Sequence, residues 1–92
     1  MSQVTRTLLS NASATGSAAS WGGGRGVFTA EGTWGGGTVK LQFKTANGTW
    51  VDYGSATTLT ANGSGVFELP ACEIRAHVAT ATAVYAYAHG VA

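Results

Sequence analysis

The chain has 92 residues, of which only 10% are charged, and its formal net charge is +1. In an ordinary soluble domain about 25% of residues are charged. This protein therefore has few surface charges to oppose its association with other proteins. The five cations are scattered singly along the chain, which excludes the basic patch of a nucleic-acid-binding protein. We therefore expect one small domain that works packed against other protein, without a nucleic-acid partner.

The cysteine content and the N-terminus indicate the compartment. Cys72 is the only cysteine, so the internal disulfide that a small secreted domain would normally need cannot form. The first residues, Met-Ser-Gln-Val-Thr-Arg, are not followed by the apolar run of a signal peptide. No apolar stretch reaches the roughly 18 residues of a membrane span. We expect a reduced, soluble product made in the cytoplasm, without a membrane partner.

Residues 1–20 form the first of two predicted regions. The apolar residues of this region include Val4, Leu8 and Leu9. Residues 3–9 are therefore either a first strand or an arm that docks on a neighbouring subunit. Residues 10–20 contain only Ser, Asn, Ala, Thr and Gly, and such a segment buries too little to offset its ordering entropy. We expect a flexible lead-in there, or else part of an arm that becomes ordered only against a neighbour.

Residues 21–92 form the second region, a single β domain. The sequence Trp-Gly-Gly-Gly occurs at residues 21–24 and again at 34–37, and each copy precedes a predicted strand. The first of these strands is residues 26–33. In it Val27, Thr29 and Glu31 alternate with Phe28, Ala30 and Gly32. The glycine triplets lack the spacing, lysine and hydroxyl of a phosphate-binding loop. We expect them instead to adopt positive φ in broad turns, or to let a neighbouring backbone approach closely.

The best-defined element is a hairpin formed by residues 38–45 and 49–53. Its first strand contains the run Val-Lys-Leu-Gln-Phe-Lys, the period-2 pattern of a half-buried strand. A three-residue loop, with Gly48 at left-handed φ in a bulged type I turn, keeps the apolar side chains on one face. The predicted pairs are Phe43 with Val51 and Leu41 with Tyr53 on the inner face, and Gln42 with Asp52 and Lys44 with Trp50 on the wet face.

Four further short strands are predicted at residues 56–60, 66–69, 73–79 and 83–89. An Asn-Gly-Ser-Gly turn precedes the strand at residues 66–69, and Pro70, the only proline, ends that strand. In the last strand Tyr85 and Tyr87 face away from its small apolar residues. No segment has helical periodicity. About seven or eight short strands, separated by turn signals, predict an all-β fold: a small antiparallel β-sandwich or β-barrel.

Residues that carry chemistry are few and dispersed. His77 and His89 are the only histidines, and together with Cys72 they lack the close-spaced pairs of a zinc site. Without a paired base, Cys72 is expected to be a small buried apolar residue. The carboxylates are Glu31, Asp52, Glu68 and Glu73. A chain of this size rarely builds the cleft in which a carboxylate pair acts, so we expect no enzyme, no catalytic residue, no metal and no cofactor.

Aromatic residues are frequent: Trp21, Trp34, Trp50, Tyr53, Tyr85 and Tyr87 stand out. One interpretation is that they fill the core or brace the sheet. A second is that some lie at a protein interface, where Trp and Tyr are enriched. A third is the sugar platform of a carbohydrate-binding module, with exposed rings beside Asn and Asp. The candidate interface residues are Val4, Leu8, Leu9, Trp21, Trp34, Trp50, Tyr85 and Tyr87.

Three stretches resemble a pattern found in small virion proteins of tailed bacteriophages. Residues 32–42, Gly-Thr-Trp-Gly-Gly-Gly-Thr-Val-Lys-Leu-Gln, are similar to the Gly-rich beginning of its first strand. Residues 49–51, Thr-Trp-Val, resemble its next strand. Residues 67–76, Phe-Glu-Leu-Pro-Ala-Cys-Glu-Ile-Arg-Ala, resemble a third segment, in which Cys72 replaces a glycine. The resemblance covers about residues 26–88 and carries no functional residues.

This resemblance implies a small β domain built into the virion. Head decoration, or cement, is the first expected role: the protein would bind the major capsid protein on the outer lattice, as a homo-trimer, and stabilise the shell. A neck, tail or adaptor component of the virion is the alternative. The expected location is the capsid surface, after synthesis in the host cytoplasm.

Overall fold

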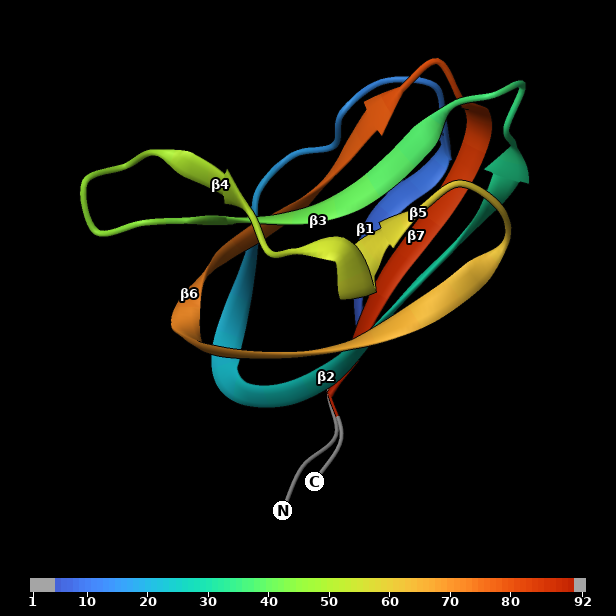
Figure 1. Cartoon of the computed structure of the whole chain (residues 1–92). Coiled ribbons are helices and arrows are strands. Elements are labelled where there is room, and N and C mark those ends of the chain that lie inside the picture. Colours follow the sequence, from blue (N-terminus) through green and yellow to red (C-terminus); the bar gives the residue numbers. More distant parts are fainter. Residues whose placement is uncertain (1–4, 91–92) are drawn as a thin grey trace.

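The structure is a computed structural model that describes residues 5–90 (Figure 1). Its elements are β1 (Thr5–Ala12), β2 (Ala19–Thr33), β3 (Thr38–Lys44), β4 (Trp50–Asp52), the short 3-10 helix η1 (Ser55–Thr57), β5 (Thr58–Leu59), β6 (Gly63–Ala79) and β7 (Thr82–Gly90). The strands form one antiparallel sheet in the order β1-β7-β2-β6-β3-β4, and β5 also pairs with β3. The predicted all-β antiparallel fold is confirmed for the described residues, and this sheet is not closed into a barrel.

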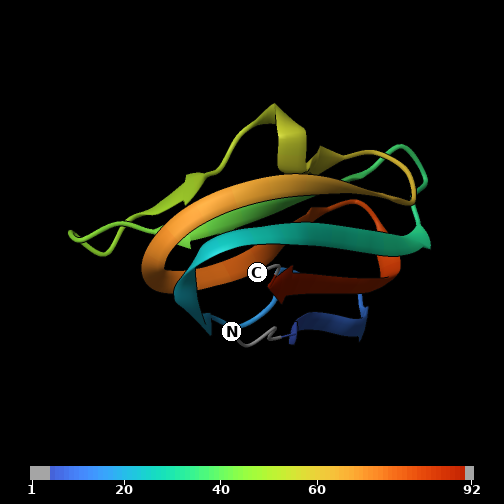
Figure 2. The ribbon, with the colours of Figure 1, turned by 90° about the horizontal axis from the view of Figure 1, so that it is seen from below.

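Two long strands bend the sheet back on itself. β2 has 15 residues and β6 has 17, and the two pair along most of their length. The second part of β2 also pairs with β7, and the second part of β6 with β3. Each long strand therefore belongs to both halves of the sheet (Figure 2). β2 bends at Gly23 and Gly24, whose φ angles are 98° and 103°, where Gly23 lies against the backbone of Pro70.

A single strand, β6, replaces the two strands predicted at residues 66–69 and 73–79. A break was predicted because proline has no N–H for the ladder and is tolerated in a sheet only at edges or irregular positions. In the structure β3 pairs with β6 only from Ile74 to Ala79. Pro70 therefore lies in a part of β6 that has no β3 neighbour, and the strand passes through it without ending.

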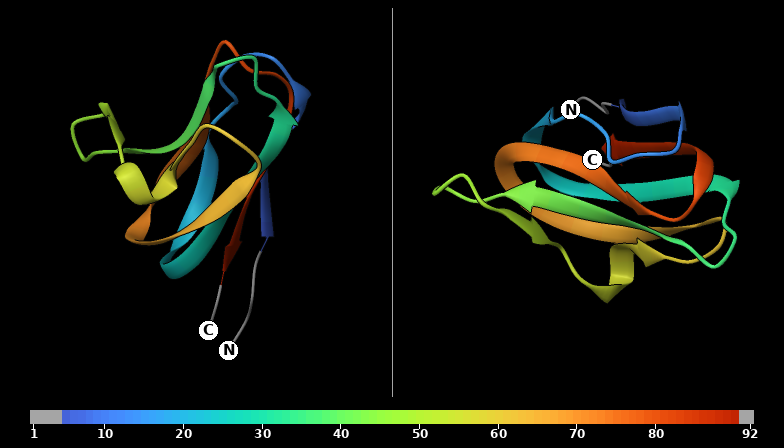
Figure 3. Two further views of the ribbon diagram at one scale, coloured as in Figure 1. Left: turned by 45° about the vertical axis from the view of Figure 1, so that its right-hand side comes forward. Right: turned by 90° about the horizontal axis from the view of Figure 1, so that it is seen from above.

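The core lies between the two halves of the bent sheet (Figures 2 and 3). Trp21 and Phe67 pack with their ring centroids 4.9 Å apart. Gly26 lies against both, since a Cβ at this position would come within 2.7 Å of each ring. The other buried apolar side chains are Leu8, Leu9, Phe28, Ala30, Val39, Leu41, Leu69, Ile74, Ala76, Ala81, Val84, Ala86 and Ala88.

The strand β1 contributes to this core from one edge of the sheet. It pairs with β7, and its register shifts between Thr7 and Leu9. Neighbouring residues of a regular strand face opposite sides, so this shift is what allows both Leu8 and Leu9 to be buried. Of the two alternatives for this segment, the described residues adopt the strand.

The predicted flexible lead-in, residues 10–20, is also part of the fold. Its two ends belong to β1 and β2. Between them, the Gly16 N–H donates to the Ala76 carbonyl at 3.0 Å, and the Val78 N–H donates to the Thr15 hydroxyl at 3.2 Å. Hydrogen bonds to β6 supply an order that the composition of the segment does not predict. An arm that orders only against a neighbour therefore does not describe this region.

The hairpin of β3 and β4 has the predicted register. The pairs are Gln42 with Asp52, Phe43 with Val51 and Lys44 with Trp50. Gly48 has a φ of 85°, and its N–H donates to the Thr45 carbonyl at 2.8 Å, as in the predicted turn. Burial differs from the prediction, because Gln42 is 8% exposed whereas Val51 is 38% exposed. The hairpin projects beyond the body of the sheet (Figures 1 and 3), so its tip has little to pack against.

The structure differs from the prediction for residues 56–60 and agrees with it for residues 83–89. Residues 56–60 are not one strand, because the Thr57 N–H donates to the Gly54 carbonyl at 3.2 Å and closes the turn of η1 before β5 begins. The alternation predicted for β7 is confirmed. Its small residues are buried, and Tyr85 and Tyr87 are half-buried on the outer face.

Candidate functional site

The candidate site lies on the outer face of β7 and β2, next to the start of β6. Side chains alternate along a strand, so the burial of the small residues of β7 turns Tyr85, Tyr87 and His89 outward. On the neighbouring β2, Glu31 pairs with Tyr85 and Thr29 with Tyr87. The rings of Tyr87 and His89 have centroids 5.9 Å apart and planes tilted by 34°. Three rings therefore follow one another along β7.

Tyr85 and Tyr87 line a groove with a volume of about 180 Å³. Its lining residues are Thr29, Ala30, Glu31, Asn62, Gly63, Tyr85 and Tyr87. Drug-sized ligands occupy pockets of roughly 300–1,000 Å³, so this groove matches one small ring. It combines two aromatic side chains with a carboxylate, a carboxamide and a hydroxyl, and none of the described residues that line it is cationic.

The carboxamide of Asn62 is held in one orientation. Its Oδ1 accepts hydrogen bonds from the Gly32 N–H at 3.0 Å and from Trp34 Nε1–H at 2.8 Å. Two donors on the oxygen determine which way the group is turned, so Nδ2 remains as a donor of fixed direction. Sequence reasoning missed this role, since Asn62 has the ordinary pattern of a turn residue. Nothing in the local sequence links it to a tryptophan 28 residues away.

The histidines and the cysteine do not come together. The ring nitrogens of His89 lie 3.3 Å from the Thr5 hydroxyl and 3.5 Å from the Thr29 hydroxyl, whereas His77 lies on the part of β6 that pairs with β3. Burial raises the pKa of the Cys72 thiol, which favours its neutral form. The described residues contain no group of three or more potential metal ligands. No helix in that part of the chain is long and apolar enough to cross a membrane.

A polar network covers the outer face of β3, β4 and β6. Asp52 Oδ1 accepts a hydrogen bond from Gln42 Nε2 at 2.7 Å, and its Oδ2 lies 2.9 Å from Lys40 Nζ. Arg75 Nε–H donates to Gln42 Oε1 at 2.8 Å, and the Arg75 guanidinium lies 4.4 Å from the centre of the Trp50 ring. The hydrogen bonds from Gln42 and Lys40 hold the pKa of Asp52 below its usual value. These groups are engaged with one another, so the network braces the hairpin.

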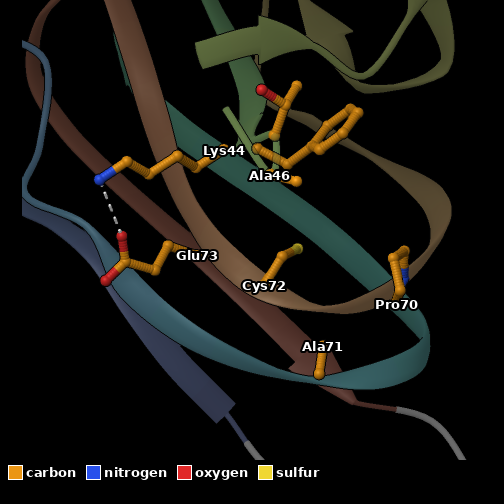
Figure 4. A pocket seen from close by; sticks show the side chains of 8 residues that line it. Lys44, Ala46, Pro70, Ala71, Cys72 and Glu73 are labelled. Carbon is orange, nitrogen blue, oxygen red and sulfur yellow. Dashed lines mark ion pairs between the residues drawn. The ribbon is translucent and has the colours of Figure 1, made fainter. Parts of the chain in front are cut away.

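A larger notch opens beside the bend of β6 (Figure 4). It forms where the pairing of β3 with β6 ends, at Phe43 and Ile74. An ion pair joins Lys44 Nζ to Glu73 Oε1 at 3.4 Å on its rim. The notch has a volume of about 570 Å³. Its other lining residues, most of them apolar, are Phe43, Thr45, Ala46, Pro70, Ala71 and Cys72.

The eight candidate interface residues are separated by the fold. Three of them pack in the chain's own core, contrary to the expected surface role: Leu8, Leu9 and Trp21. Two are half-buried and engaged within the chain: Trp34 and Trp50. Two line the groove: Tyr85 and Tyr87. Val4 lies outside the described residues. Apolar and aromatic residues signal a core as strongly as an interface, so composition does not separate the two.

A solved structure of another protein has a similar fold. No family model matches the chain, and no curated protein matches its sequence. The crystal structure of the SPBc2 prophage-derived protein YomS superposes on the chain with a TM-score of 0.72. The superposition covers 97% of this chain and 94% of that one at 12% sequence identity. What the two proteins share at this identity is the fold.

Proposed function

We propose that this protein is a non-enzymatic structural component of a bacteriophage particle, in which it decorates the outer surface of the capsid. The observation that carries the proposal is the shared fold, because nearly the whole chain superposes on a prophage-derived protein. The segments at residues 32–42 and 67–76, which resemble those of small virion proteins, point the same way. A sparsely charged domain whose polar network is engaged within the chain suits a part packed against other protein.

The notch is the proposed contact with the major capsid protein. Most of its lining residues are apolar, which suits the apolar centre of a protein interface. The projecting hairpin forms one wall of the notch and the bend of β6 the other, so an inserted capsid loop would be held from two sides. Charged residues are depleted at the centres of interfaces. Of the described residues that line the notch, only Lys44 and Glu73 are charged, and they pair with each other.

Binding to the assembled lattice would stabilise the shell by linkage. A protein that binds the assembled state and not its parts favours that state by about 2.7 kcal/mol per site when its concentration is 100 times the Kd. A homo-trimer, the expected assembly, would add avidity because several notches engage one lattice. The shell would then resist heat better than an undecorated one.

The test uses phage particles that lack this protein. Purified protein is added back, and the bound copy number and the temperature of DNA release are measured. We expect saturation at a fixed ratio to the major capsid protein and release at a higher temperature. Ala46→Glu places a charge in the notch and should weaken binding about tenfold or more, a loss of about 1.4 kcal/mol. Ala18→Glu, at a position that is also exposed but lies outside the notch, should bind like the parent.

The number of copies per particle distinguishes a place on the capsid surface from one in the neck or tail. A few copies per particle would place the protein in the neck or tail, and absence from purified virions would refute a virion role. Light scattering of the free protein measures its oligomeric state. If Ala46→Glu binds as well as Ala18→Glu, the notch is not the contact.

A further inference from the structure

We propose that the groove beside Tyr85 and Tyr87 binds a neutral sugar, with one pyranose ring in the groove. This activity goes beyond the capsid role and does not depend on it, because the groove and the notch share no lining residue. The first support is the size of the groove, about 180 Å³, which suits a single ring.

The second support is the aromatic wall. A pyranose presents a face of C–H groups that packs on an aromatic ring, and a rim of hydroxyls that needs hydrogen-bond partners. Tyr85 and Tyr87 are two residues apart on the outer face of one strand, so their Cα atoms are about 6.8 Å apart. Both side chains line the groove and supply its aromatic surface. Trp50 differs from them, because the Arg75 guanidinium already lies over its ring.

The third support is the set of polar groups in the groove. Asn62 supplies an N–H donor whose direction is fixed by the hydrogen bonds on its Oδ1 from Gly32 and Trp34. Glu31 supplies a carboxylate acceptor, and Thr29 a hydroxyl that can donate or accept. Aromatic contact with a few fixed polar groups is the general composition of a small-ligand site. A donor fixed before binding costs less ordering entropy than a mobile one.

The charge of the groove favours a neutral ligand. Glu31 is its one charged lining residue among those described, and it is exposed. A phosphate or an acidic sugar would meet this carboxylate without a cation to balance it, whereas sugar hydroxyls would donate to it. The geometry therefore points to a neutral hexose or an N-acetylated hexosamine.

The experiment titrates isotope-labelled protein with the methyl glycosides of glucose, galactose, mannose and N-acetylglucosamine, and follows amide shifts by NMR. We expect at least one sugar to give saturable shifts with millimolar affinity, largest near residues 29–31, 62–63 and 85–87. Tyr87→Ala should weaken that binding about tenfold or more, which is about 1.4 kcal/mol. Trp50→Ala, an aromatic removal at the hairpin, should leave it unchanged.

Two milder variants keep the test decisive if Tyr87→Ala does not fold. Asn62→Asp retains an oxygen for Trp34 and Gly32, replaces the Nδ2 donor with an acceptor and adds a negative charge beside Glu31, so it should lower affinity, and a melting temperature like the parent's would show that the fold is kept. Glu31→Gln alters an exposed side chain and should lower affinity as well. Saturable shifts confined to the notch, or equal affinity in all variants, would overturn the proposal.

A blank panel would also overturn it. If in that case Tyr87→Ala abolished binding to phage particles, the face would be a protein contact instead. Failure of the capsid proposal leaves the sugar titration unaffected, because the titration uses the free protein alone. The two proposals are therefore refuted by different measurements.

Discussion

The turn of the β3–β4 hairpin offers a clean test of backbone strain. Gly48 has a φ of 85°, and its N–H donates to the Thr45 carbonyl at 2.8 Å. A Cβ at Gly48 would meet only Lys44 Cε, at 3.8 Å, an ordinary contact. A side chain at this position therefore begins in nearly open space, and the main cost of valine is the positive φ.

The expected loss of stability is therefore the cost of backbone strain at residue 48. A residue other than glycine in the left-handed region costs about 1–3 kcal/mol, and a β-branched one lies at the upper end. For a domain of this size, each kcal/mol lowers the Tm by about 4–8 °C. Gly48→Asn, which tolerates left-handed φ better, should cost less than Gly48→Val.

The assay is urea unfolding together with a thermal melt. Gly22→Val is the matched control, because Gly22 lies in β2, has no positive φ, and a Cβ added to it would meet no neighbouring atom within 4 Å. The ladder of the hairpin is short, so amide exchange of Thr45 and Gly48 should be followed as well, to detect strain released by local opening. If Gly48→Val melts like the parent and its amides remain protected, the strain argument is wrong.

Three further predictions concern other parts of the fold. Leu9→Ala should lower the free energy of unfolding by about 2–5 kcal/mol, as expected of a residue in a core strand. An unchanged midpoint in urea would instead favour the interpretation of this segment as a docking arm. Gly26→Ala should cost about 1–3 kcal/mol by overpacking against two rings and the His89 carbonyl oxygen, and a melt equal to the parent's would mean that these neighbours move aside freely. Hydrogen bonds from Gln42 and Lys40 lower the pKa of Asp52 in the folded state. The Asp52 carboxylate therefore adds to the free energy of unfolding at pH values above its ordinary pKa of 3.8, and this contribution is lost as the pH falls through its pKa in the folded protein. Asp52→Asn should therefore destabilise at neutral pH by under about 1 kcal/mol, since the pair is exposed, and this difference should shrink in acid; a difference independent of pH would contradict the assignment.

Local sequence was sufficient for the hairpin and for β7. In the hairpin, the glycine at left-handed φ and the alternating pattern set the register together, since a slip of one residue would reverse every side chain. In β7, strict alternation separated the buried small residues from Tyr85 and Tyr87. Both features depend on residues close together in the chain, which is why they were predictable.

Long-range pairing determined what the sequence did not reveal. The continuity of β6 through Pro70 depends on where β3 stops pairing. The burial of both Leu8 and Leu9 depends on a register shift against β7, about 80 residues later. The orientation of Asn62 in the groove likewise depends on Trp34, which lies 28 residues away in the chain. In each case the decisive partner is distant in the chain and leaves no local pattern.

The edges of the sheet give the last reason to place partner contacts on faces. Strand addition needs a regular exposed edge. β1 has two register shifts and a residue at positive φ, Asn11 at 51°, and β4 has only three residues. Distorted and short edges are how natural sheets avoid pairing with other chains. We therefore expect the proposed capsid and sugar contacts at the notch and the groove, and a protomer bound through its notch would leave its groove open. Ala46→Glu should then change only particle binding, and Glu31→Gln only sugar binding.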